Sequence, residues 1–368
     1  MNGPKIAVIA AERGGFVRAA PLIAELRERA GCQPHFIFAG EDYVPHASSE
    51  LFRDLGMPFA DAVIGASEGT PAHRLAKVMV GCERAVGNPE LGAVVLVGSS
   101  HTILACAIAC AQAAAVVAHA EAGLRAPGIL GRTSVAAQID AACGMLLAPS
   151  EQAHDRLLDE GADEGSVVLA GSLACDAVAQ CIERARAHDA PARAGLQRKG
   201  FGFAVIEAPD HIEHLANLKK VADILTQAQE LLPIAFNVHP RLVRRLESWQ
   251  LAQEMAGLPQ LVSVEPRGYV DYLALLDSAR VVLTDVGGVQ DEATFLGVPC
   301  LTLGETTDRA ATVDSGNNTL IGLDPHRAVQ ALEAVLGNEY PRPTPPAAWD
   351  GRASSRIADA LLQAKGSG

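Results

Sequence analysis

Two glycines followed by an acidic residue identify one stretch of this chain as a candidate ligand-binding site. The apolar run Val281–Leu283 leads into a polar turn that contains Gly287 and Gly288. This order predicts a strand, a glycine turn and the start of a helix. Glycines let the backbone approach a ligand, and free N–H groups at a helix start favour an anion, phosphate above all. Glu292 could accept hydrogen bonds from ribose hydroxyls; the alternative is a tight turn that binds nothing.

Polar side chains follow several other predicted strands. They are Arg13, the turn at Gly98, the segment 119–121, His239 and Asp285. In open parallel sheets, ligands bind at the carboxyl ends of the strands. The position of these residues therefore predicts one shared site.

The elements that must position these residues alternate along the chain. Apolar runs predict strands over 5–10, 33–39, 93–97, 115–119, 145–149, 167–170, 203–207, 234–239, 261–264, 299–303 and 319–321, in addition to the opening stretch. Helical spacing predicts helices over 16–29, 102–112, 215–230, 269–276 and 353–363, with a turn over 11–15. Strands that alternate with helices imply βαβ units and parallel sheets.

Length and composition indicate a globular protein with two domains. The chain has 368 residues, of which 49% are hydrophobic and 20% charged. We predict a first domain over 1–178, a linker over 179–200, a second domain over 201–346 and a C-terminal helix over 347–368. The net charge of −13 argues against general binding to nucleic acid or an anionic membrane.

The eight cysteines include no Cys-x-x-Cys pair, and most lie in apolar surroundings typical of buried thiols. With an N-terminus that lacks a signal-peptide layout, they predict a cytoplasmic protein. The apolar stretch 94–118 is interrupted by polar residues, which favours strand–helix–strand over a membrane span. His211 and His214 could form half of a metal site, but a polar helix start is the simpler interpretation, and we predict no metal.

Several motifs together resemble a known family. They are Ala20-Pro21-Leu22, His119-Ala120-Glu121-Ala122-Gly123-Leu124-Arg125, Gly287-Gly288-Val289-Gln290-Asp291-Glu292-Ala293, Thr306-Thr307-Asp308-Arg309 and Asp350-Gly351. On these motifs the chain resembles, over nearly its whole length, the non-hydrolysing bacterial UDP-N-acetylglucosamine 2-epimerases and their hydrolysing relatives. The resemblance implies an α/β, GT-B-like fold of two Rossmann-like domains with a ligand cleft between them. It also implies a UDP-sugar partner, no cofactor and a homodimer.

The resemblance assigns the nucleotide side of the site. Gly287 and Gly288 would meet the diphosphate, and Glu292 the ribose hydroxyls. The other residues carried over are Arg13 for the phosphates, Arg309 for the nucleotide-sugar side, Arg267 and Tyr272 for the uracil, and His239 near the cleft. Guanidinium groups supply the charge and paired donors that a diphosphate needs. The alternatives are a surface arginine at Arg13, a solvated acid at Glu292 and a turn histidine at His239.

The family reaction removes the C2 proton, expels UDP from C1 and adds UDP back to a glycal intermediate. It needs acid–base groups and stabilisation of the departing UDP. The residues at the corresponding positions are Glu121, Arg18, Ser99 and His211. Ser99 stands where the family has an aspartate, and a hydroxyl is a poor base unless it is activated; nearby His101 could contribute.

Other positions also depart from the family pattern. Arg18 replaces a lysine, Val286 replaces a serine, and Ala208-Pro209-Asp210-His211 replaces Gly-His-Arg-Arg. Arg132-Thr133 stands where the family has Asn-Arg, in a loop that also lacks the family's Pro-Glu-Glu. Glu41-Asp42 stands where the family's allosteric site has amides. We therefore expect the nucleotide side to be retained better than the sugar side.

Three functions remain open at this point. The first is a 2-epimerase-like enzyme that acts at C2 and C1 of a UDP-N-acetylhexosamine, by UDP elimination and re-addition or by hydrolysis. The second is a GT-B glycosyltransferase, which would release UDP only when an acceptor is present. The third is a catalytically silent protein that binds a nucleotide-sugar without turnover.

Overall fold

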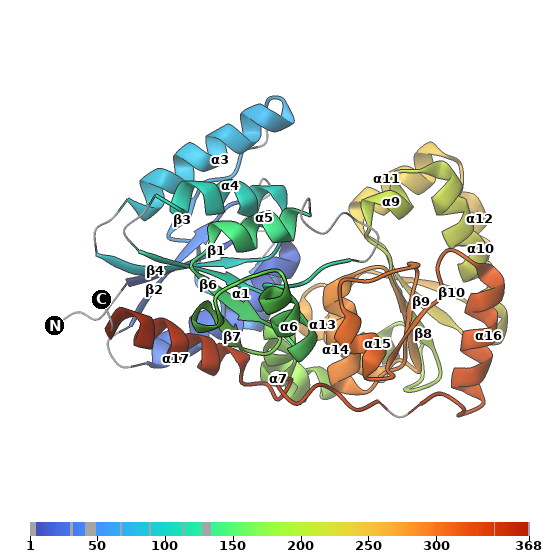
Figure 1. Ribbon diagram of the computed structural model, residues 1–368. Coiled ribbons are helices and arrows are strands. Elements are labelled where there is room, and N and C mark those ends of the chain that lie inside the picture. The colour runs from blue at the N-terminus through green and yellow to red at the C-terminus, as the bar shows by residue number, and fades with distance from the viewer. Residues whose placement is uncertain are drawn as a thin grey trace. The chain divides into compact units, whose positions relative to one another are not determined.

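The computed structural model describes residues 5–29, 32–40, 49–66, 68–87, 90–112, 115–126, 134–341 and 343–366. The chain divides into two compact units. Unit 1 comprises Met1–Gln180 and Pro346–Gly368, and unit 2 comprises Cys181–Pro345. Each unit contains one parallel sheet with its own helices (Figure 1).

The sheet of unit 1 has seven parallel strands in the order β3-β2-β1-β4-β5-β6-β7. The strands are β1 (Lys5–Ala10), β2 (Gln33–Phe38), β3 (Ala62–Val63), β4 (Leu91–Val97), β5 (Val116–Ala120), β6 (Met145–Ala148) and β7 (Val167–Leu169). Helices cover both faces of a parallel sheet, so its strands are buried on both sides and appear in the sequence as short apolar runs. The six strands predicted in this part of the chain are confirmed.

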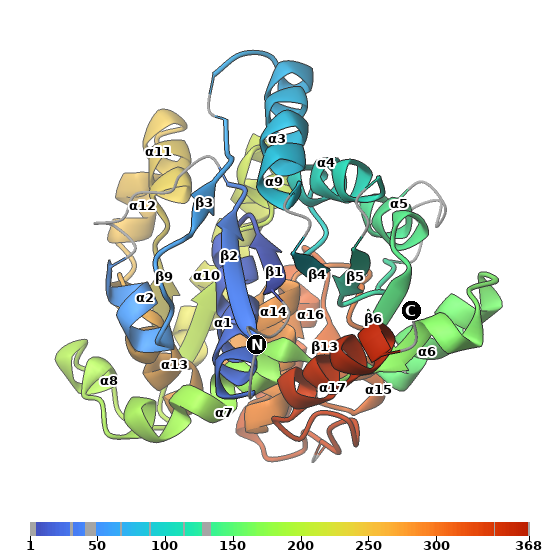
Figure 2. The same cartoon turned by 90° about the vertical axis from the view of Figure 1, so that its left-hand side faces the viewer.

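Helices lie on both faces of the unit 1 sheet (Figures 1 and 2). They are α1 (Arg13–Glu28), α2 (Ser49–Leu55), α3 (Pro71–Val86), α4 (His101–Cys110), α5 (Val135–Ala142), α6 (Glu151–Asp159) and α17 (Ala353–Gly366), with a short 3₁₀ turn at Glu164–Ser166. On one face, α1 and α17 contribute Leu22 and Ile357 to an apolar cluster. On the other face, α3 and α4 contribute Val78 and Ile103 to a second cluster. The core of unit 1 therefore has one layer on each side of the sheet.

The C-terminal segment is anchored to unit 1 by buried hydrogen bonds. The Trp349 Nε1–H donates to the carbonyl of Pro149 at 2.7 Å. The carboxylate of Asp176 accepts from Ala353 N at 3.0 Å, and from Ser354 N and Oγ at 2.7 and 2.6 Å. Asp176 thereby satisfies N–H groups at the start of α17. Asp176 lies in α7 (Leu173–Arg186), a helix that continues past Gln180, where the two units divide.

The sheet of unit 2 has six parallel strands in the order β10-β9-β8-β11-β12-β13. The strands are β8 (Gly202–Val205), β9 (Ile234–Asn237), β10 (Leu261–Val264), β11 (Val281–Thr284), β12 (Cys300–Thr302) and β13 (Asn318–Leu320). The helices are α8 (Ala190–Arg193), α9 (Pro209–Ile212), α10 (Leu215–Leu231), α11 (Pro240–Ser248), α12 (Ala252–Ala256), α13 (Tyr269–Ser278), α14 (Gly287–Leu296), α15 (Ala310–Asp314) and α16 (Pro325–Leu336). Two parallel α/β units of this kind confirm the predicted fold class of two Rossmann-like domains.

The predicted turn over 11–15 is wrong, because α1 begins at Arg13. The reason lies in the packing of the glycines. A Cβ at Gly15 would lie 3.3 Å from the Cβ of Ala10, so glycine lets the first turn of the helix pack against the end of β1. The glycines are part of the helix rather than of a connecting turn.

The apolar stretch 94–118 contains most of β4, all of α4 and the start of β5, as predicted. None of the helices within the described residues combines the length and apolar content needed to cross a membrane.

Candidate functional site

At the start of α14 in unit 2, the backbone lies against one guanidinium, that of Arg309. Gly287 and Gly288 are its first two residues. A Cβ at Gly287 would lie 2.8 Å from Nε of Arg309, whereas no described atom lies within 4 Å of a Cβ at Gly288. The Arg309 guanidinium therefore packs directly against the helix start, beside open space over Gly288. Helix N–H groups and a guanidinium in this arrangement favour a phosphate oxygen.

Arg309 is held in this position by acidic side chains. It is 6% exposed, and its Nη1 lies 3.5 Å from Oδ2 of the buried Asp291, one turn along α14 from Gly287. Its Nε lies 3.6 Å from Oδ1 of Asp308. Fixing the long side chain in advance lowers the ordering cost of binding an anion.

Glu292 already has two phenol donors inside unit 2. The hydroxyl of Tyr269 donates to Oε1 at 2.9 Å, and the hydroxyl of Tyr272 donates to Oε2 at 2.7 Å. Burial first, and the negative charge of Glu292 next, raise the pKa of Tyr269 well above its usual value. The two hydroxyls fix the orientation of the buried Glu292 carboxylate.

His211 and Asp285 meet at the carboxyl ends of β8 and β11. His211 Nδ1 lies 2.7 Å from Oδ2 of Asp285. The same carboxylate accepts from the backbone N–H groups of Glu207 and Ala208 at 2.8 and 3.1 Å. Asp285 therefore joins the turn after β8 to the end of β11.

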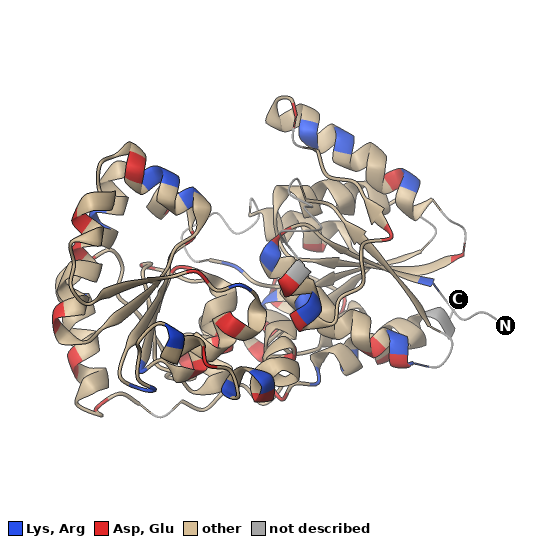
Figure 3. Cartoon of the chain, turned by 180° about the vertical axis from the view of Figure 1, so that it is seen from behind, with Lys and Arg blue, Asp and Glu red and all other residues tan. Residues whose placement is uncertain are grey.

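His239 and Arg267 follow the next two strands of the sheet. His239 precedes α11, where its Nδ1 accepts from Arg241 N at 3.3 Å. Arg267 is exposed and precedes α13. In Figure 3 further basic residues (blue) gather on α11, and two of them, Arg241 and Arg245, are ion-paired with Glu213. His239 thus has a helix-capping role, while the exposed guanidinium of Arg267 remains accessible.

In unit 1, Arg18 and Glu121 form an ion pair at the strand ends. Nη1 of Arg18, from α1, lies 3.0 Å from Oε2 of Glu121, which directly follows β5. Glu121 has a φ of 69°, in the left-handed region that glycine favours. Holding a glutamate there costs about 1–2 kcal/mol, and such strain is common where a side chain must be aimed at a ligand.

Arg18 also reaches the turn that carries Ser99. A Cβ at Gly98 would lie 3.4 Å from Nη2 of Arg18. Ser99 is exposed at this turn, and Arg13 is exposed at the first position of α1. The structure therefore gathers Arg18, Glu121 and the Ser99 turn at one edge of the unit 1 sheet, with Arg13 about one and a half helical turns away from Arg18 along α1.

His119 supports this edge from within the core. Its Nδ1 lies 2.5 Å from Oδ1 of Asp140, and its Nε2 lies 3.0 Å from the carbonyl oxygen of Gly98. Asp140 also contacts Arg125 at 2.7 Å and accepts from Gly123 N at 3.1 Å. Burial alone would raise the pKa of Asp140, but the hydrogen bond and charge of His119, with Arg125 and the Gly123 N–H, hold it below its usual value. This network fixes the turns on either side of Glu121.

Sequence reasoning missed two buried polar residues of these sites. Asp140 is the only charged residue of the helix Val135–Ala142, and Tyr269 begins a helix whose residues are buried. A charged residue within an apolar helix is a signal that could have identified Asp140, because a buried charge needs a partner.

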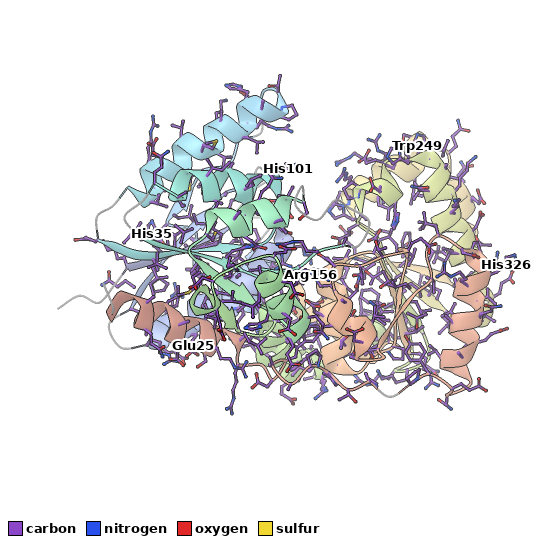
Figure 4. The ribbon with its side chains drawn as sticks, viewed as in Figure 1. Glu25, His35, His101, Arg156, Trp249 and His326 are labelled. Atoms are coloured by element: carbon purple, nitrogen blue, oxygen red, sulfur yellow. The ribbon has the colours of Figure 1, made fainter. Side chains whose placement is uncertain are left out.

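His101 is the first residue of α4 (Figure 4) and is exposed. With Arg74, Leu75 and Thr102, it lines a cavity of about 290 Å³ in unit 1. The predicted positions Glu41, Asp42, Arg132 and Thr133 lie outside the described residues. Within those residues, no three His, Cys, Asp or Glu side chains form a group that could hold a metal ion.

Comparison with known proteins identifies the family. A family model described as UDP-N-acetylglucosamine 2-epimerase matches residues 24–362. The chain is 27% identical to the UDP-N-acetylglucosamine 2-epimerase of Methanocaldococcus jannaschii, over 98% of this chain and 100% of that protein. It is 26% identical to the UDP-2,3-diacetamido-2,3-dideoxy-D-glucuronate 2-epimerase of Pseudomonas aeruginosa, over 98% of this chain and 99% of that protein.

The fold agrees with this assignment. The chain is similar to the crystal structure of the Methanocaldococcus jannaschii UDP-GlcNAc 2-epimerase in complex with UDP-GlcNAc and UDP. The TM-score is 0.87 at 27% identity, over 98% of this chain and 99% of that chain. From the family match over nearly its whole length, the chain belongs to the UDP-N-acetylglucosamine 2-epimerase family.

Proposed function

We propose that this protein is a UDP-sugar 2-epimerase-like isomerase that acts at C2 and C1 of a UDP-N-acetylhexosamine. The observation that carries this proposal is the start of α14, where the Arg309 guanidinium packs on Gly287 and the space over Gly288 is open. The names of the relatives support a UDP-linked 2-acetamido sugar as the substrate class, since both act on such sugars. Both epimerisation and hydrolysis of this substrate are compatible with the proposal.

The nucleotide is bound through groups of unit 2. The N–H groups at Gly287 and Gly288 and the Arg309 side chain bind the diphosphate, and Glu292 accepts from the ribose hydroxyls. Arg267 and Tyr272 bind the uracil, His239 belongs to the nucleotide-binding side, and Arg13 contributes positive charge to the phosphates. Direct hydrogen bonds from charged donors to phosphate are the stronger contacts of this set.

The reaction begins when the C2–H bond breaks and its electron pair forms a C1=C2 double bond. The C1–O bond breaks at the same time, and UDP leaves with the electron pair of the C1–O bond. In epimerisation, UDP adds back to C1 and C2 gains a proton on its opposite face; in hydrolysis, water adds to C1 instead. Removing an unactivated C–H proton and stabilising the leaving phosphate both require fixed charged groups.

Glu121 is the carboxylate proposed to move the C2 proton. Its ion pair with Arg18 holds the ionised side chain at the edge of the unit 1 sheet. Arg18 and His211 balance the negative charge that develops on the departing UDP, and the Ser99 hydroxyl faces the sugar where the family has a carboxylate. With serine at this position, hydrolysis or slow re-addition is an accessible outcome.

The proposal also covers the cellular location and the oligomeric state of the protein. The protein acts in the cytoplasm, which is supported by its free cysteines, most of them buried. It is a homodimer, as the family resemblance implies.

Incubation with UDP-GlcNAc in deuterated water tests the function. Proton NMR should show loss of the C2 proton signal, with either the C2 epimer or free sugar and UDP as product. UDP release only with an added sugar acceptor would instead indicate a glycosyltransferase. Binding without exchange or UDP release, for a panel of UDP-2-acetamido sugars, would leave a silent binding protein and end the proposal.

A further inference from the structure

Asp285, at the glycine turn, makes contacts with residues outside that turn. Its carboxylate is almost completely buried and receives three donors: Glu207 N on Oδ1, and Ala208 N and His211 Nδ1 on Oδ2. The side chain of His211 is 14% exposed, so one part of the ring remains open to solution. The pair thus has a buried acid behind a partly accessible imidazole.

The chemistry of the pair determines which nitrogen carries the proton. An ionised carboxylate can only accept hydrogen bonds, so the neutral ring must place its proton on Nδ1 to make the 2.7 Å contact. Nε2 then carries the free lone pair and is the nitrogen left for a ligand.

The backbone contacts make this orientation rigid. Because Asp285 also binds Glu207 N and Ala208 N, its carboxylate cannot rotate away from His211 without breaking two further hydrogen bonds. The ring is therefore held from behind by the same group that closes the turn after β8. His211 also lines a cavity of about 520 Å³ with Lys220, Glu305 and Asp324.

We propose that Asp285 is a positioning residue that fixes His211 in its Nδ1–H form, so that Nε2 faces the UDP that leaves and returns. This role rests on the proposed function, in which His211 balances charge on UDP. Asp285 itself touches no reacting atom; it acts through the imidazole. Carboxylate–histidine pairs in which the acid sets the tautomer and orientation act in this way in other enzymes.

Nitrogen NMR of the full-length protein tests the orientation without relying on activity. The ¹⁵N-histidine-labelled protein is measured at a pH at which the ring is neutral, and the His211 signals are assigned by comparison with His211→Gln. These signals should show the Nδ1–H form. In Asp285→Ala the Nε2–H form should predominate. The control is Asp61→Ala, which removes a similar partner, since Asp61 contacts His35 Nδ1 at 3.5 Å and accepts from Phe36 N. The control should leave His211 unchanged.

A double-mutant cycle then tests the coupling to turnover. Asp285→Ala should lower kcat by at least about tenfold, and by no more than the roughly 10²- to 10⁴-fold that acid–base catalysis contributes, and should change KM less. In the His211→Gln background the same substitution should lower kcat by less than about twofold. Asp285→Asn, which keeps one oxygen for one of the two backbone donors, serves if the alanine variant unfolds.

Two results would overturn the positioning role. One is a His211 tautomer that is the same with and without Asp285. The other is a loss of kcat from Asp285→Ala that is as large in the His211→Gln background as in the native protein. If the native protein turns over no UDP-sugar, the proposed function fails, while the NMR result still decides whether Asp285 positions His211.

Discussion

The guanidinium of Arg309 occupies the space that a side chain at Gly287 would need, with Nε 2.8 Å from the position of a Cβ. The next residue, Gly288, has no described atom within 4 Å of its Cβ position. Two adjacent glycines at one helix start therefore have different roles: Gly287 seats an arginine, and Gly288 leaves room for a ligand.

Substitution of each glycine by alanine should separate these roles. Gly287→Ala should displace Arg309, lower the free energy of unfolding by about 1–3 kcal/mol and weaken UDP binding. Gly288→Ala should keep or raise stability, by up to about 1 kcal/mol, because alanine favours the helix. It should still weaken UDP binding, because the methyl group enters the open space. Chemical denaturation and calorimetry measure both quantities; unchanged UDP affinity in Gly288→Ala would contradict the assignment.

Glu121→Gln should remove the carboxylate proposed for the C2 proton. We expect C2 exchange to fall by about 10²-fold or more, in the range of general acid–base catalysis, with little change in UDP affinity. The matched control is Glu25→Gln, another arginine-paired glutamate, whose Oε1 contacts Arg29 at 2.8 Å on the surface of α1 (Figure 4). Equal exchange rates for the two variants would show that Glu121 is not required.

Tyr269→Phe should affect stability and nucleotide binding together. Loss of the buried hydroxyl leaves Oε1 of Glu292 without this donor and should cost about 1–3 kcal/mol. Because Glu292 is then less well oriented, UDP affinity should fall by about tenfold. In Tyr340→Phe, which removes hydrogen bonds to Cys300 O and Asn317 O elsewhere in unit 2, stability should fall while UDP affinity is retained. Equal UDP affinities in both variants would contradict the role of Glu292.

Asp140→Asn should destabilise the protein in a pH-dependent way. The folded pKa of Asp140 lies below its usual value, so the carboxylate contributes stability above pH of about 3.9, and this is lost as pH falls through the folded pKa. Near neutral pH we expect a loss of about 2–4 kcal/mol, because His119 and Arg125 lose a buried charged partner. Urea unfolding at several pH values should show the two proteins converging below about pH 3.9. A gap that stays constant into strong acid would refute this account.

The strands were predictable because parallel strands buried on both faces leave short apolar runs in the sequence. Helix α3 was not predicted: of its 16 residues only Val78, Cys82 and Val86 are buried, which leaves a weak apolar stripe. Strand β3 has two residues, too few for any periodicity. Elements at the edge of a sheet bury little and so leave little trace in composition.

The sequence located candidate site residues at strand ends but did not specify their contacts. The resemblance pointed to Glu292 and Glu121, and strand ends placed their neighbours. The partners that hold them, such as Tyr269 for Glu292 and Arg18 for Glu121, lie 23 and 103 residues away along the chain. Such pairs depend on how helices pack on their sheet, which a linear pattern does not specify.

The hydrogen bonds from Ala353 and Ser354 to Asp176 attach the last helix of the chain to unit 1. Unit 1 can therefore be completed only at the end of synthesis. Unit 1 is discontinuous in sequence, and its last helix is synthesised only after the whole of unit 2. Domains generally fold as they leave the ribosome, N-terminal part first. While unit 2 is being synthesised, the apolar face of α1 that packs against α17 is therefore uncovered. Chaperone protection of the nascent chain is most valuable during this period.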